Sequence, residues 1–423
     1  MSPAIRFQRG KVRVPFLFSV ASFMTKAPTI LQAVPWLDSG GVERGTVDIA
    51  AAISAAGGEA LVAAEPGRLQ GELEAAGGEL LPLKGRSKNP FAILWSNARA
   101  IEKMIRQRNV SLVHARSRAP AWSAMIAARR TGVPFVTTYH GAYSQKGRFK
   151  AFYNSVMAKG DVVIANSDYT ARLIAERNPD AASRILSIYR GVDMDQFDLA
   201  AIAPERGEQL RKAWDLDDRP VLLLPSRLTR WKGQSFILPV LGALKKTGVA
   251  FQLVLIGDDQ GRKAYIDELD RLIKAHGLKD CARRVGHCSD MPAAYALADL
   301  VIVPSQDAET FGRSAAESLA LGTPVLVGDL GAQPEVTACP EGVDTDQWIA
   351  LSLPHADEAA WTEAILWGLA LPADAIADMA PIARAHIEAH FSLASMSRQT
   401  LAVYDQLLGC DLANIYDMTK GKA

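Results

Sequence analysis

Residues 29–65 read TILQAVPWLDSGGVERGTVDIAAAISAAGGEALVAAE. An apolar run opens this stretch, and two glycines then precede an amphipathic segment at about residues 42–56 that we expect to form a helix. A second apolar run follows at residues 60–65. Two strands joined through one helix are the unit of a parallel sheet, because parallel neighbours need a crossover connection. The stretch therefore predicts an α/β fold that begins near Thr29.

The same alternation continues along the chain in two series. In the first series, apolar runs stand at residues 79–83, 111–116, 134–140, 162–167 and 184–189. In the second series, they stand at residues 221–227, 251–257, 283–287, 300–305 and 324–328. The segments between them predict helices, among them one at about residues 90–108 and one around Trp122. Continuous runs of this kind are typical of strands buried on both faces. The sequence therefore predicts two Rossmann-like, doubly wound parallel-sheet domains that bind ligands beyond the carboxyl ends of their strands.

The length of the chain also predicts two domains, because 423 residues exceed the size at which one hydrophobic core stops growing. We expect a first domain over residues 27–205 and a second over residues 206–385. The final segment, residues 386–423, contains a helix at about 396–408 that we expect to return across the first domain. Residues 1–26 form an N-terminal extension that is either disordered or a weak contact with a membrane surface.

Charge is distributed unevenly along the chain. Of the 47 Lys and Arg and 46 Asp and Glu, residues 1–190 hold 26 and 13, and the remainder holds 21 and 33. The first half therefore either faces an anionic partner or carries solvated helix faces, and a membrane surface, a phosphorylated acceptor and nucleic acid are all compatible partners. Four basic residues cluster shortly after residue 140: Lys146, Arg148, Lys150 and Lys159.

The composition is that of an ordinary globular protein, with 49% hydrophobic and 22% charged residues. The four cysteines form no CxxC pair and no zinc-type spacing with histidine, which fits a reducing cytosol. No uninterrupted apolar run reaches the ~18 residues of a membrane-spanning helix. We therefore expect a cytoplasmic protein that does not cross a bilayer as a helix.

Two glycines after the first strand form a candidate anion site. Gly40 and Gly41 allow close backbone approach, and the helix that begins there offers unpaired N–H groups to an anion. The segment does not match the GxGxxG dinucleotide fingerprint, because no third glycine follows at the required spacing. A simple strand-to-helix turn is the alternative interpretation.

Two cations follow the first strand of the second series, in residues 225–233, PSRLTRWKG. Arg227 stands at the strand end and Lys232 just before a helix, so both can contact one pyrophosphate. When a sugar leaves a nucleoside diphosphate, the departing oxygen gains negative charge, and fixed cations stabilise that charge. The alternative interpretation is that both side chains are solvated.

Two glutamates with seven residues between them form the most specific pattern. Glu309 lies in the loop after an apolar run and can accept hydrogen bonds from sugar hydroxyls, while Glu317 lies in the following helix and can bind a ribose diol. The N–H groups at the start of that helix belong to Phe311, Gly312 and Arg313. They can contact phosphate or sugar oxygens. Without further context, the two glutamates are equally explained as a helix cap and a surface residue.

In this order, the Gly-Gly-x-Glu-Arg loop, the Arg-x4-Lys-Gly element and the Glu-x7-Glu element resemble those of glycosyltransferase family 4, which has the GT-B fold. The resemblance covers residues 29–408. It implies that Glu309 binds the hydroxyls of the donor sugar and that Glu317 binds the ribose of the nucleotide. It also implies that Arg227 and Lys232 bind the diphosphate.

The resemblance assigns roles to three further residues. Gly41 would lie against the donor phosphate or the acceptor, and His140 matches the cleft histidine that contacts the transferred sugar near the reaction centre. His287 falls in the segment that holds the nucleobase, largely through its backbone. Arg313 departs from the pattern, because many relatives carry an aliphatic residue there. This arginine adds a phosphate contact or alters the preference for the sugar.

The family resemblance implies a metal-independent transfer with retention of anomeric configuration, and no cofactor beyond the nucleotide-sugar co-substrate. Asp193 and Asp195 spell a DxD pattern, but they lie in an expected interdomain turn, so we expect no metal site. The general likeness is to lipopolysaccharide or cell-envelope glycosyltransferases, which implies a glycan or glycolipid acceptor. It also suggests peripheral contact with an anionic membrane at its inner face, and no nucleic acid. A nucleotide-sugar epimerase, a phosphorylase and a non-catalytic sugar-nucleotide-binding subunit are the alternative functions.

Overall fold

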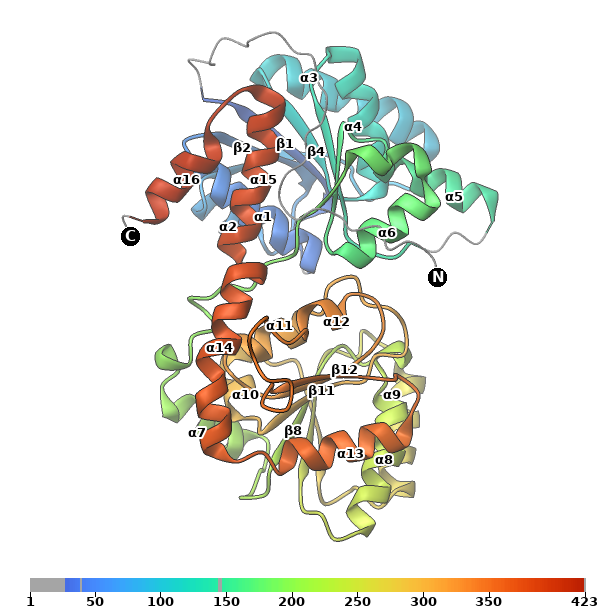
Figure 1. Cartoon of the computed structure of the whole chain (residues 1–423). Helices are drawn as coiled ribbons and strands as arrows, with labels where there is room; N and C mark the ends of the chain where they lie inside the picture. Colours follow the sequence, from blue (N-terminus) through green and yellow to red (C-terminus); the bar gives the residue numbers. More distant parts are fainter. Residues whose placement is uncertain (1–26, 39, 144–146, 422–423) are drawn as a thin grey trace, which may run out of the picture.

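The computed structural model describes residues 27–38, 40–143 and 147–421 of the chain. These residues form two α/β lobes, one above the other in Figure 1, and each lobe is built on a parallel sheet. The predicted pair of Rossmann-like domains is confirmed by this architecture. The expected extension at residues 1–26 and the basic residue Lys146 lie outside the described residues.

The first domain is built on seven parallel strands in the order β3-β2-β1-β4-β5-β6-β7. The strands are β1 (Thr29–Trp36), β2 (Glu59–Glu65), β3 (Gly78–Pro82), β4 (Leu112–Ala115), β5 (Phe135–Tyr139), β6 (Val162–Ala165) and β7 (Ile185–Ser187). The chain runs outward from β1 to β3 and then returns to the other side of β1 with β4. This reversal opens a crevice at the carboxyl ends of the strands, where ligands of doubly wound sheets bind.

Alternate residues of each strand face opposite sides of the first sheet. Ile30 and Leu112 lie in the core beneath α1 and α2, whereas Leu31 and Val113 lie in the core beneath α3, α4 and α6. The helices of this domain are α1 (Gly41–Ala55), α2 (Gln70–Ala75), α3 (Ala98–Arg108), α4 (Arg118–Thr131), α5 (Arg148–Ser155) and α6 (Asp168–Arg177). Both faces of the sheet are therefore buried, as continuous apolar strands require.

The second domain repeats this plan with six strands in the order β10-β9-β8-β11-β12-β13. The strands are β8 (Val221–Pro225), β9 (Gln252–Ile256), β10 (Ala282–Gly286), β11 (Leu300–Val303), β12 (Val325–Gly328) and β13 (Ala350–Leu353). Its helices are α7 (Pro204–Ala213), α8 (Gln234–Lys246), α9 (Lys263–Ala275), α10 (Met291–Leu297), α11 (Arg313–Ala320), α12 (Gln333–Val336), α13 (Glu358–Leu369) and α14 (Ala373–Phe391). Leu223 and Val301 pack on the side of α10, α11 and α14, and Leu222 and Ile302 on the side of α8, α9 and α13.

The chain crosses between the domains twice, and the two crossings lie side by side. Val192, after β7, accepts a hydrogen bond from the N–H of Leu393 at 2.7 Å and donates one to Phe391 at 2.8 Å. Gly191 is needed there, because a Cβ would lie 2.2 Å from the Cα of Leu393. Beyond this point the chain forms α15 (Leu393–Leu408) and α16 (Leu412–Lys420). In Figure 1, α14 rises from the second domain and α15 continues into the first.

Helices α15 and α16 complete the core of the first domain. Met396, Leu401 and Tyr404 of α15 and Tyr416 of α16 are buried in the same hydrophobic cluster as α1 and β1. The buried ring of His114 in β4 bridges two hydroxyls: its Nδ1 lies 2.7 Å from the Tyr404 hydroxyl, and its Nε2 lies 2.7 Å from Thr138 Oγ1. Residues at the end of the chain are therefore integral to the domain that its beginning forms.

The observed helices differ in detail from the predicted ones. Helix α1 begins and ends one residue before the predicted range, and α15 begins three residues earlier than predicted. The helix expected at about residues 90–108 is divided, because Ala92–Asn97 is π-helical and α3 follows it. The edge strand β13 has only four residues and was not predicted. In the described part of the chain, no single helix combines the length and apolar composition needed to span a bilayer, and the bent pair of α13 and α14 passes that test by length and composition only.

Candidate functional site

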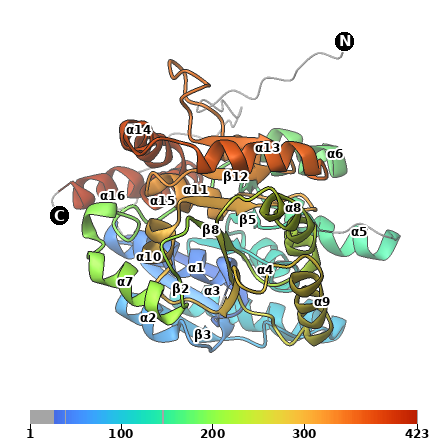
Figure 2. The same ribbon diagram turned by 90° about the horizontal axis from the view of Figure 1, so that it is seen from below.

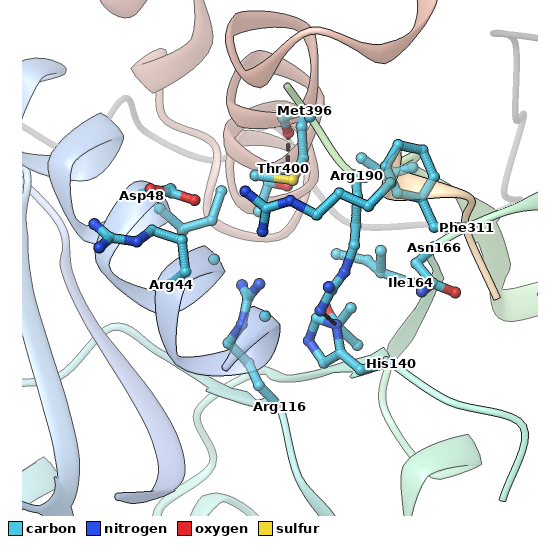
Figure 3. A pocket seen from close by; sticks show the side chains of 17 residues that line it. Arg44, Asp48, Arg116, His140, Ile164, Asn166, Arg190, Phe311, Met396 and Thr400 are labelled. Carbon is cyan, nitrogen blue, oxygen red and sulfur yellow. Dashed lines mark hydrogen bonds between the residues drawn. The ribbon is translucent and has the colours of Figure 1, made fainter. Parts of the chain in front are cut away.

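A pocket lies between the two domains, next to the carboxyl ends of β4, β5 and β6 (Figure 3). It is open to solvent on one side. The first domain contributes most of the lining, and Phe311 and Arg313, around the start of α11, contribute the part from the second domain. The charged and titratable residues that line it are Arg44, Asp48, Arg116, His140, Arg190 and Arg313.

His140 follows β5 and is held as one tautomer. Arg190 Nη2 lies 2.9 Å from His140 Nδ1, and because a guanidinium can only donate, Nδ1 accepts and the ring proton stays on Nε2. Burial, together with the charges of Arg190 and Arg116, lowers the pKa of His140 well below its usual range. Nε2 has no hydrogen-bond partner among the described residues. His140 therefore brings a neutral ring with one unpaired N–H donor to the pocket.

Two arginines of the first domain pack against glycines of α1. A Cβ on Gly41 would lie 2.4 Å from Arg190 Nη1, and a Cβ on Gly45 would lie 3.0 Å from Arg116 Nη2. Arg116 is 4% exposed, and its Nη1 lies 3.4 Å from Gln32 Oε1. Burial and the neighbouring arginines lower the pKa of Arg190 to about 10, so its side chain remains a cation at neutral pH. The glycine at position 41 therefore makes room for a guanidinium beside a helix N-terminus.

The structure brings Lys232 and Glu309 together. Lys232 Nζ lies 2.8 Å from Glu309 Oε1, and the two side chains are 12% and 13% exposed. Ser305 donates a hydrogen bond to the same carboxylate oxygen at 2.5 Å. Lys232 is the last residue of a short 3-10 turn. The next residue, Gly233, lies so close to the backbone after β11 that a Cβ there would be 1.8 Å from the carbonyl oxygen of Pro304. The lysine is thereby fixed beside the loop that carries Glu309.

Glu317 is already engaged within α11. Its carboxylate accepts hydrogen bonds from the Tyr295 hydroxyl at 2.9 Å and from Arg313 Nε at 2.6 Å, and only 7% of the residue is exposed. Arg313 also lines the pocket, so it connects this carboxylate to the interdomain space. In the described part of the chain, no hydrogen bond or ion pair links Glu317 directly to the pair of Lys232 and Glu309.

Phe311 and Gly312 contribute mainly through the backbone. The Phe311 ring is buried in the second domain, with its centroid 6.2 Å from that of Phe391. Gly312 precedes α11 with a φ of +106°, a conformation that favours glycine. Because α11 begins at the next residue, the N–H groups of its first turn have no intrahelical acceptors. These groups are available to an anion.

Two predicted donor-binding side chains have no side-chain partner among the described residues. Arg227 follows β8 and His287 follows β10, and both are exposed. Neither side chain forms a hydrogen bond or ion pair with any other residue that the structure describes. The backbone of Arg227 is fixed, since its carbonyl accepts a hydrogen bond from Gln234 Nε2 at 3.0 Å. Both side chains stand at the carboxyl edge of the second sheet.

Thr310, next to Glu309, joins the two domains at the pocket. Its Oγ1 donates to the carbonyl oxygen of His140 at 3.4 Å and lies 3.2 Å from the side-chain amide of Asn166. Through Thr310, the loop of Glu309 in the second domain therefore lies directly against the backbone of His140. This contact brings His140 and Glu309, which the sequence predicts for one site, to opposite sides of one interface.

Asp193, the first aspartate of the DxD pattern, stabilises a turn. Asp193 Oδ1 accepts hydrogen bonds from the N–H groups of Asp195 and Gln196, each at 3.1 Å. Asp258 makes the same kind of turn contact with Gln260 at 2.5 Å. Among the residues that the structure describes, no three His, Cys, Asp or Glu side chains gather in a way that could hold a metal ion.

Sequence reasoning missed several polar residues of the pocket, among them Arg116, Asn166 and Arg190. Arg116 directly follows β4 and Asn166 directly follows β6, which is the same signal that identified His140 after β5. Arg190 stands three residues beyond β7, in a segment that the sequence identified only as a connection. Asp48 was also missed, although it lies one helical turn from Arg44 on the same face of α1.

Two family models match the chain, one in each domain. The model described as Glycosyltransferase Family 4 covers residues 39–196, and the model described as Glycosyl transferases group 1 covers residues 207–365. A glycosyltransferase from Rickettsia africae ESF-5, solved by crystallography, is 32% identical, with 90% of this chain and 99% of that chain aligned and a TM-score of 0.82. The Anabaena protein HepE, crystallised with UDP and glucose, shares the fold at 21% identity, with 90% of this chain and 100% of that chain aligned and a TM-score of 0.75.

Curated relatives match over shorter stretches. A GDP-mannose-dependent alpha-(1-6)-phosphatidylinositol monomannoside mannosyltransferase from Mycobacterium tuberculosis is 32% identical over 185 residues, which is 41% of this chain and 46% of that protein. The protein of the same name from Mycolicibacterium smegmatis is 28% identical over 251 residues, which is 56% of this chain and 63% of that protein. The chain thus spans about half the length of the curated relatives that it matches.

Proposed function

The chain belongs to the glycosyltransferases of family 4, and from that premise we propose that it transfers a sugar from a nucleoside-diphosphate donor to an acceptor with retention of anomeric configuration. The observation that carries the proposal is the pair of Lys232 and Glu309, 2.8 Å apart beside a loop that contacts His140. A cation next to a carboxylate fits the part of a donor where a diphosphate meets sugar hydroxyls.

The donor would lie along the carboxyl edge of the second sheet. Lys232 and Arg227 would bind the diphosphate, and the unpaired N–H groups at the start of α11 would bind its oxygens. Glu309 would accept hydrogen bonds from sugar hydroxyls, and Glu317 would accept them from the ribose. The exposed segment around His287 would hold the nucleobase. The exposure of Arg227 supports this assignment, because an arginine with no protein partner is free to bind phosphate.

The transfer breaks the bond between the anomeric carbon and the diphosphate oxygen, and forms a bond from that carbon to the acceptor oxygen. The acceptor hydroxyl would attack from the face that the diphosphate leaves, and its proton would pass to the departing phosphate. Lys232 and Arg227 would stabilise the charge that develops on the diphosphate, the role that a metal ion has in other transferases. The neutral ring of His140 would donate its Nε2 proton in a hydrogen bond to the transferred sugar or to its phosphate.

We further propose a glycolipid or lipopolysaccharide acceptor that the enzyme meets at an anionic membrane. Helix α5 supports this: Phe149 is 94% exposed and Phe152 is 65% exposed, beside the basic residues Arg148 and Lys150. The helix projects from the edge of the first domain in both views (Figures 1 and 2). Exposed aromatic rings flanked by cations are suited to the interface of an anionic bilayer.

Vesicle sedimentation tests the membrane proposal. We expect the protein to sediment at low salt with vesicles of phosphatidylcholine and phosphatidylglycerol, and not with phosphatidylcholine alone. Replacing Phe149 and Phe152 by Ser should abolish sedimentation, whereas the control variant Leu366→Ser, which alters an exposed apolar residue of the second domain, should not. Equal sedimentation of all three proteins would contradict the role of α5.

Transfer itself is tested with the purified protein. Protection against thermal unfolding by UDP-, GDP- and ADP-sugars identifies the donor, and the anomeric configuration of the product, read by NMR, decides between retention and inversion. A nucleotide-sugar epimerase would alter the donor when no acceptor is present. A non-catalytic binding subunit would bind the donor but release no nucleotide. Either result, or an inverted product, would overturn the proposal.

A further inference from the structure

Two arginines in the interdomain pocket form no ion pair with any residue that the structure describes. Arg116 and Arg190 line the pocket, and neither forms an ion pair with any Asp or Glu among the described residues. The other two pocket arginines are paired, Arg44 with Glu72 and Arg313 with Glu317. The contacts of Arg116 and Arg190 are to neutral groups, the side-chain oxygen of one glutamine and a ring nitrogen of His140.

Two carboxylates act on these arginines at a distance, Asp48 on Arg116 and Glu43 on Arg190, and neither forms an ion pair with them in the described part of the chain. Glu43 accepts a hydrogen bond from Trp36 Nε1 at 3.0 Å and is mostly buried. Asp48 lies in the pocket, where burial raises its pKa to about 6 in spite of the charges of Arg44, Arg313 and Arg116. Even where Asp48 is ionised, one carboxylate does not offset both Arg116 and Arg190, so the pocket keeps an excess of positive charge near neutral pH.

The helix beside the arginines adds to this charge. The guanidinium of Arg190 packs on Gly41 and that of Arg116 packs on Gly45, both in the first turns of α1. A helix N-terminus carries partial positive charge and unpaired N–H groups, so it disfavours cations and attracts anions. Water can satisfy the N–H donors of a buried guanidinium but cannot neutralise its charge. Buried unpaired charges are costly, so an arrangement of this kind is expected where a ligand supplies the anion.

The pocket is separate from the cations assigned to the donor. Lys232 and Arg227 stand at the edge of the second sheet, and neither lines this pocket. Arg116 and Arg190 belong to the first domain, on the side of His140 that faces α1 and α15. An anion bound by them would lie next to the reaction centre and opposite the donor.

We propose that Arg116 and Arg190 bind an oxyanion, a phosphate or a carboxylate, on the acceptor itself, so that the enzyme selects acceptors that carry such a group close to the reacting hydroxyl. The inference rests on the proposed function, and it names the chemical class of the acceptor. Arg190 connects the anion to His140 through a single hydrogen bond, so a bound anion would also fix the position of the histidine. A neutral sugar of the same shape would leave the buried Arg116 and the half-buried Arg190 unpaired and would be a poor acceptor.

A binding experiment tests the pocket without knowledge of the acceptor. With the donor site filled by whichever of UDP, GDP or ADP protects the protein best, inorganic phosphate is titrated by calorimetry. We expect Arg116→Gln to weaken phosphate binding by ~30-fold or more, Arg116→Lys to weaken it less, and the control Arg106→Gln, an exposed arginine of α3, to leave it unchanged. The affinity for the nucleotide should be the same in all four proteins. Unchanged phosphate binding in Arg116→Gln would overturn the proposal.

Transfer to matched acceptors provides the second test. Glucose, glucose 6-phosphate and glucuronate share one ring and differ in the anion, so they distinguish a neutral acceptor, a phosphate and a carboxylate. We expect at least one of the two anions to be glycosylated with a kcat/KM ~30-fold or more above that of glucose. In Arg190→Lys and Arg116→Gln this preference should shrink, because kcat/KM for the anionic acceptor falls more than kcat/KM for glucose. An equal fall in kcat/KM for all three acceptors, in variants that unfold at the wild-type temperature, would overturn the specificity role.

The two failures can be told apart. If no nucleotide binds and no sugar is transferred, the proposed function fails. Phosphate binding to Arg116 and Arg190 can then still be measured by titration of the Lys232→Ala variant. This variant lacks a cation at the donor edge, so phosphate that binds to it is assigned to the arginine pocket. If nucleotide binds and sugar is transferred, but glucose is as good an acceptor as its two anionic analogues in wild-type protein, the oxyanion site fails and the glycosyltransferase stands.

Discussion

The carboxylate of Glu335, in the second domain, caps a helix of the first domain by accepting a hydrogen bond from the N–H of Tyr169 at 2.6 Å. It also accepts one from the N–H of Asp168 at 3.0 Å, and both donors belong to the first turn of α6. Arg172 and the Tyr189 hydroxyl complete its contacts. A negative charge at a helix N-terminus is stabilising, so this contact holds the two domains in the closed arrangement that forms the pocket.

Removing the cap should open the molecule. In Glu335→Ala, the lost charge-assisted hydrogen bonds should cost roughly 1.5–3 kcal/mol each where they are not replaced by water. We expect a larger radius of gyration by small-angle scattering in the absence of ligand, and a rise in KM for both substrates. The control variant Glu341→Ala changes an exposed glutamate of the same domain and should behave as wild type. A scattering curve identical to wild type would show that other contacts hold the domains together.

Two neighbouring cations of one short turn should differ sharply in importance. Lys232 pairs with Glu309 inside the site, whereas Arg230 pairs with Glu268 on the surface. We expect Lys232→Ala to lower kcat/KM by at least ~100-fold, the scale for losing one group that stabilises the transition state. Arg230→Ala should retain nearly full activity. Both proteins should unfold cooperatively near the wild-type temperature, and comparable activities would contradict the assignment of Lys232.

The buried carboxyl of Asp48 should make stability depend on pH. Its folded-state pKa of about 6 lies above the ordinary value of 3.8, so the folded protein holds a proton that the unfolded chain has already lost between these values. Stability therefore falls as pH rises through this window. The free energy of unfolding, measured in urea from pH 4 to 8, should fall for wild type relative to Asp48→Asn and level off above pH 7. If the free energies of unfolding of wild type and Asp48→Asn changed in parallel with pH, the folded-state pKa of Asp48 would be near its ordinary value.

The hydroxyl of Tyr404 should matter for stability and not for transfer. Its partner, the His114 ring, is fully buried, so Tyr404→Phe leaves one ring nitrogen unsatisfied at a cost of about 1–3 kcal/mol. The control Tyr416→Phe lies in the same cluster, and the structure gives its hydroxyl no partner among the described residues, so we expect a change within about 0.5 kcal/mol. Denaturant unfolding measures both, and kcat should be unchanged in each variant.

Much of the fold follows from local pattern. Apolar runs bounded by glycine or polar residues identify most of the strands of both sheets, because strands buried on both faces must be continuously apolar. Strand β13 escaped prediction, since its four residues Ala350–Leu353 include a serine and form an edge. The division of the helix at Asn97 also has no clear sign in the sequence. It accompanies a long-range contact, in which the Asn97 amide donates to the carbonyl of Lys84.

The site is less predictable, because its geometry depends on contacts between distant segments. Lys232 and Glu309 are 77 residues apart, and family resemblance alone predicts that they share a ligand. The burial of Arg116 depends on the absence of a side chain at Gly45, and the position of Glu335 depends on a helix 166 residues earlier. Position after a strand identifies polar residues that can reach the crevice, but it does not say which of them meet or which lack a counter-ion.

The return of α15 and α16 to the first sheet has a consequence for biogenesis. A ribosome releases β1 through β7 long before it reaches Leu393, so the emerging first domain lacks the apolar side chains of Met396, Leu401 and Tyr404 that cover one face of its sheet. That face stays exposed while the whole second domain is synthesised. The last helix of the second domain, α14, is synthesised before α15. The second domain can therefore complete its native packing before the first domain does, although its segments emerge later. The nascent chain is thus expected to need protection from aggregation at its N-terminal half.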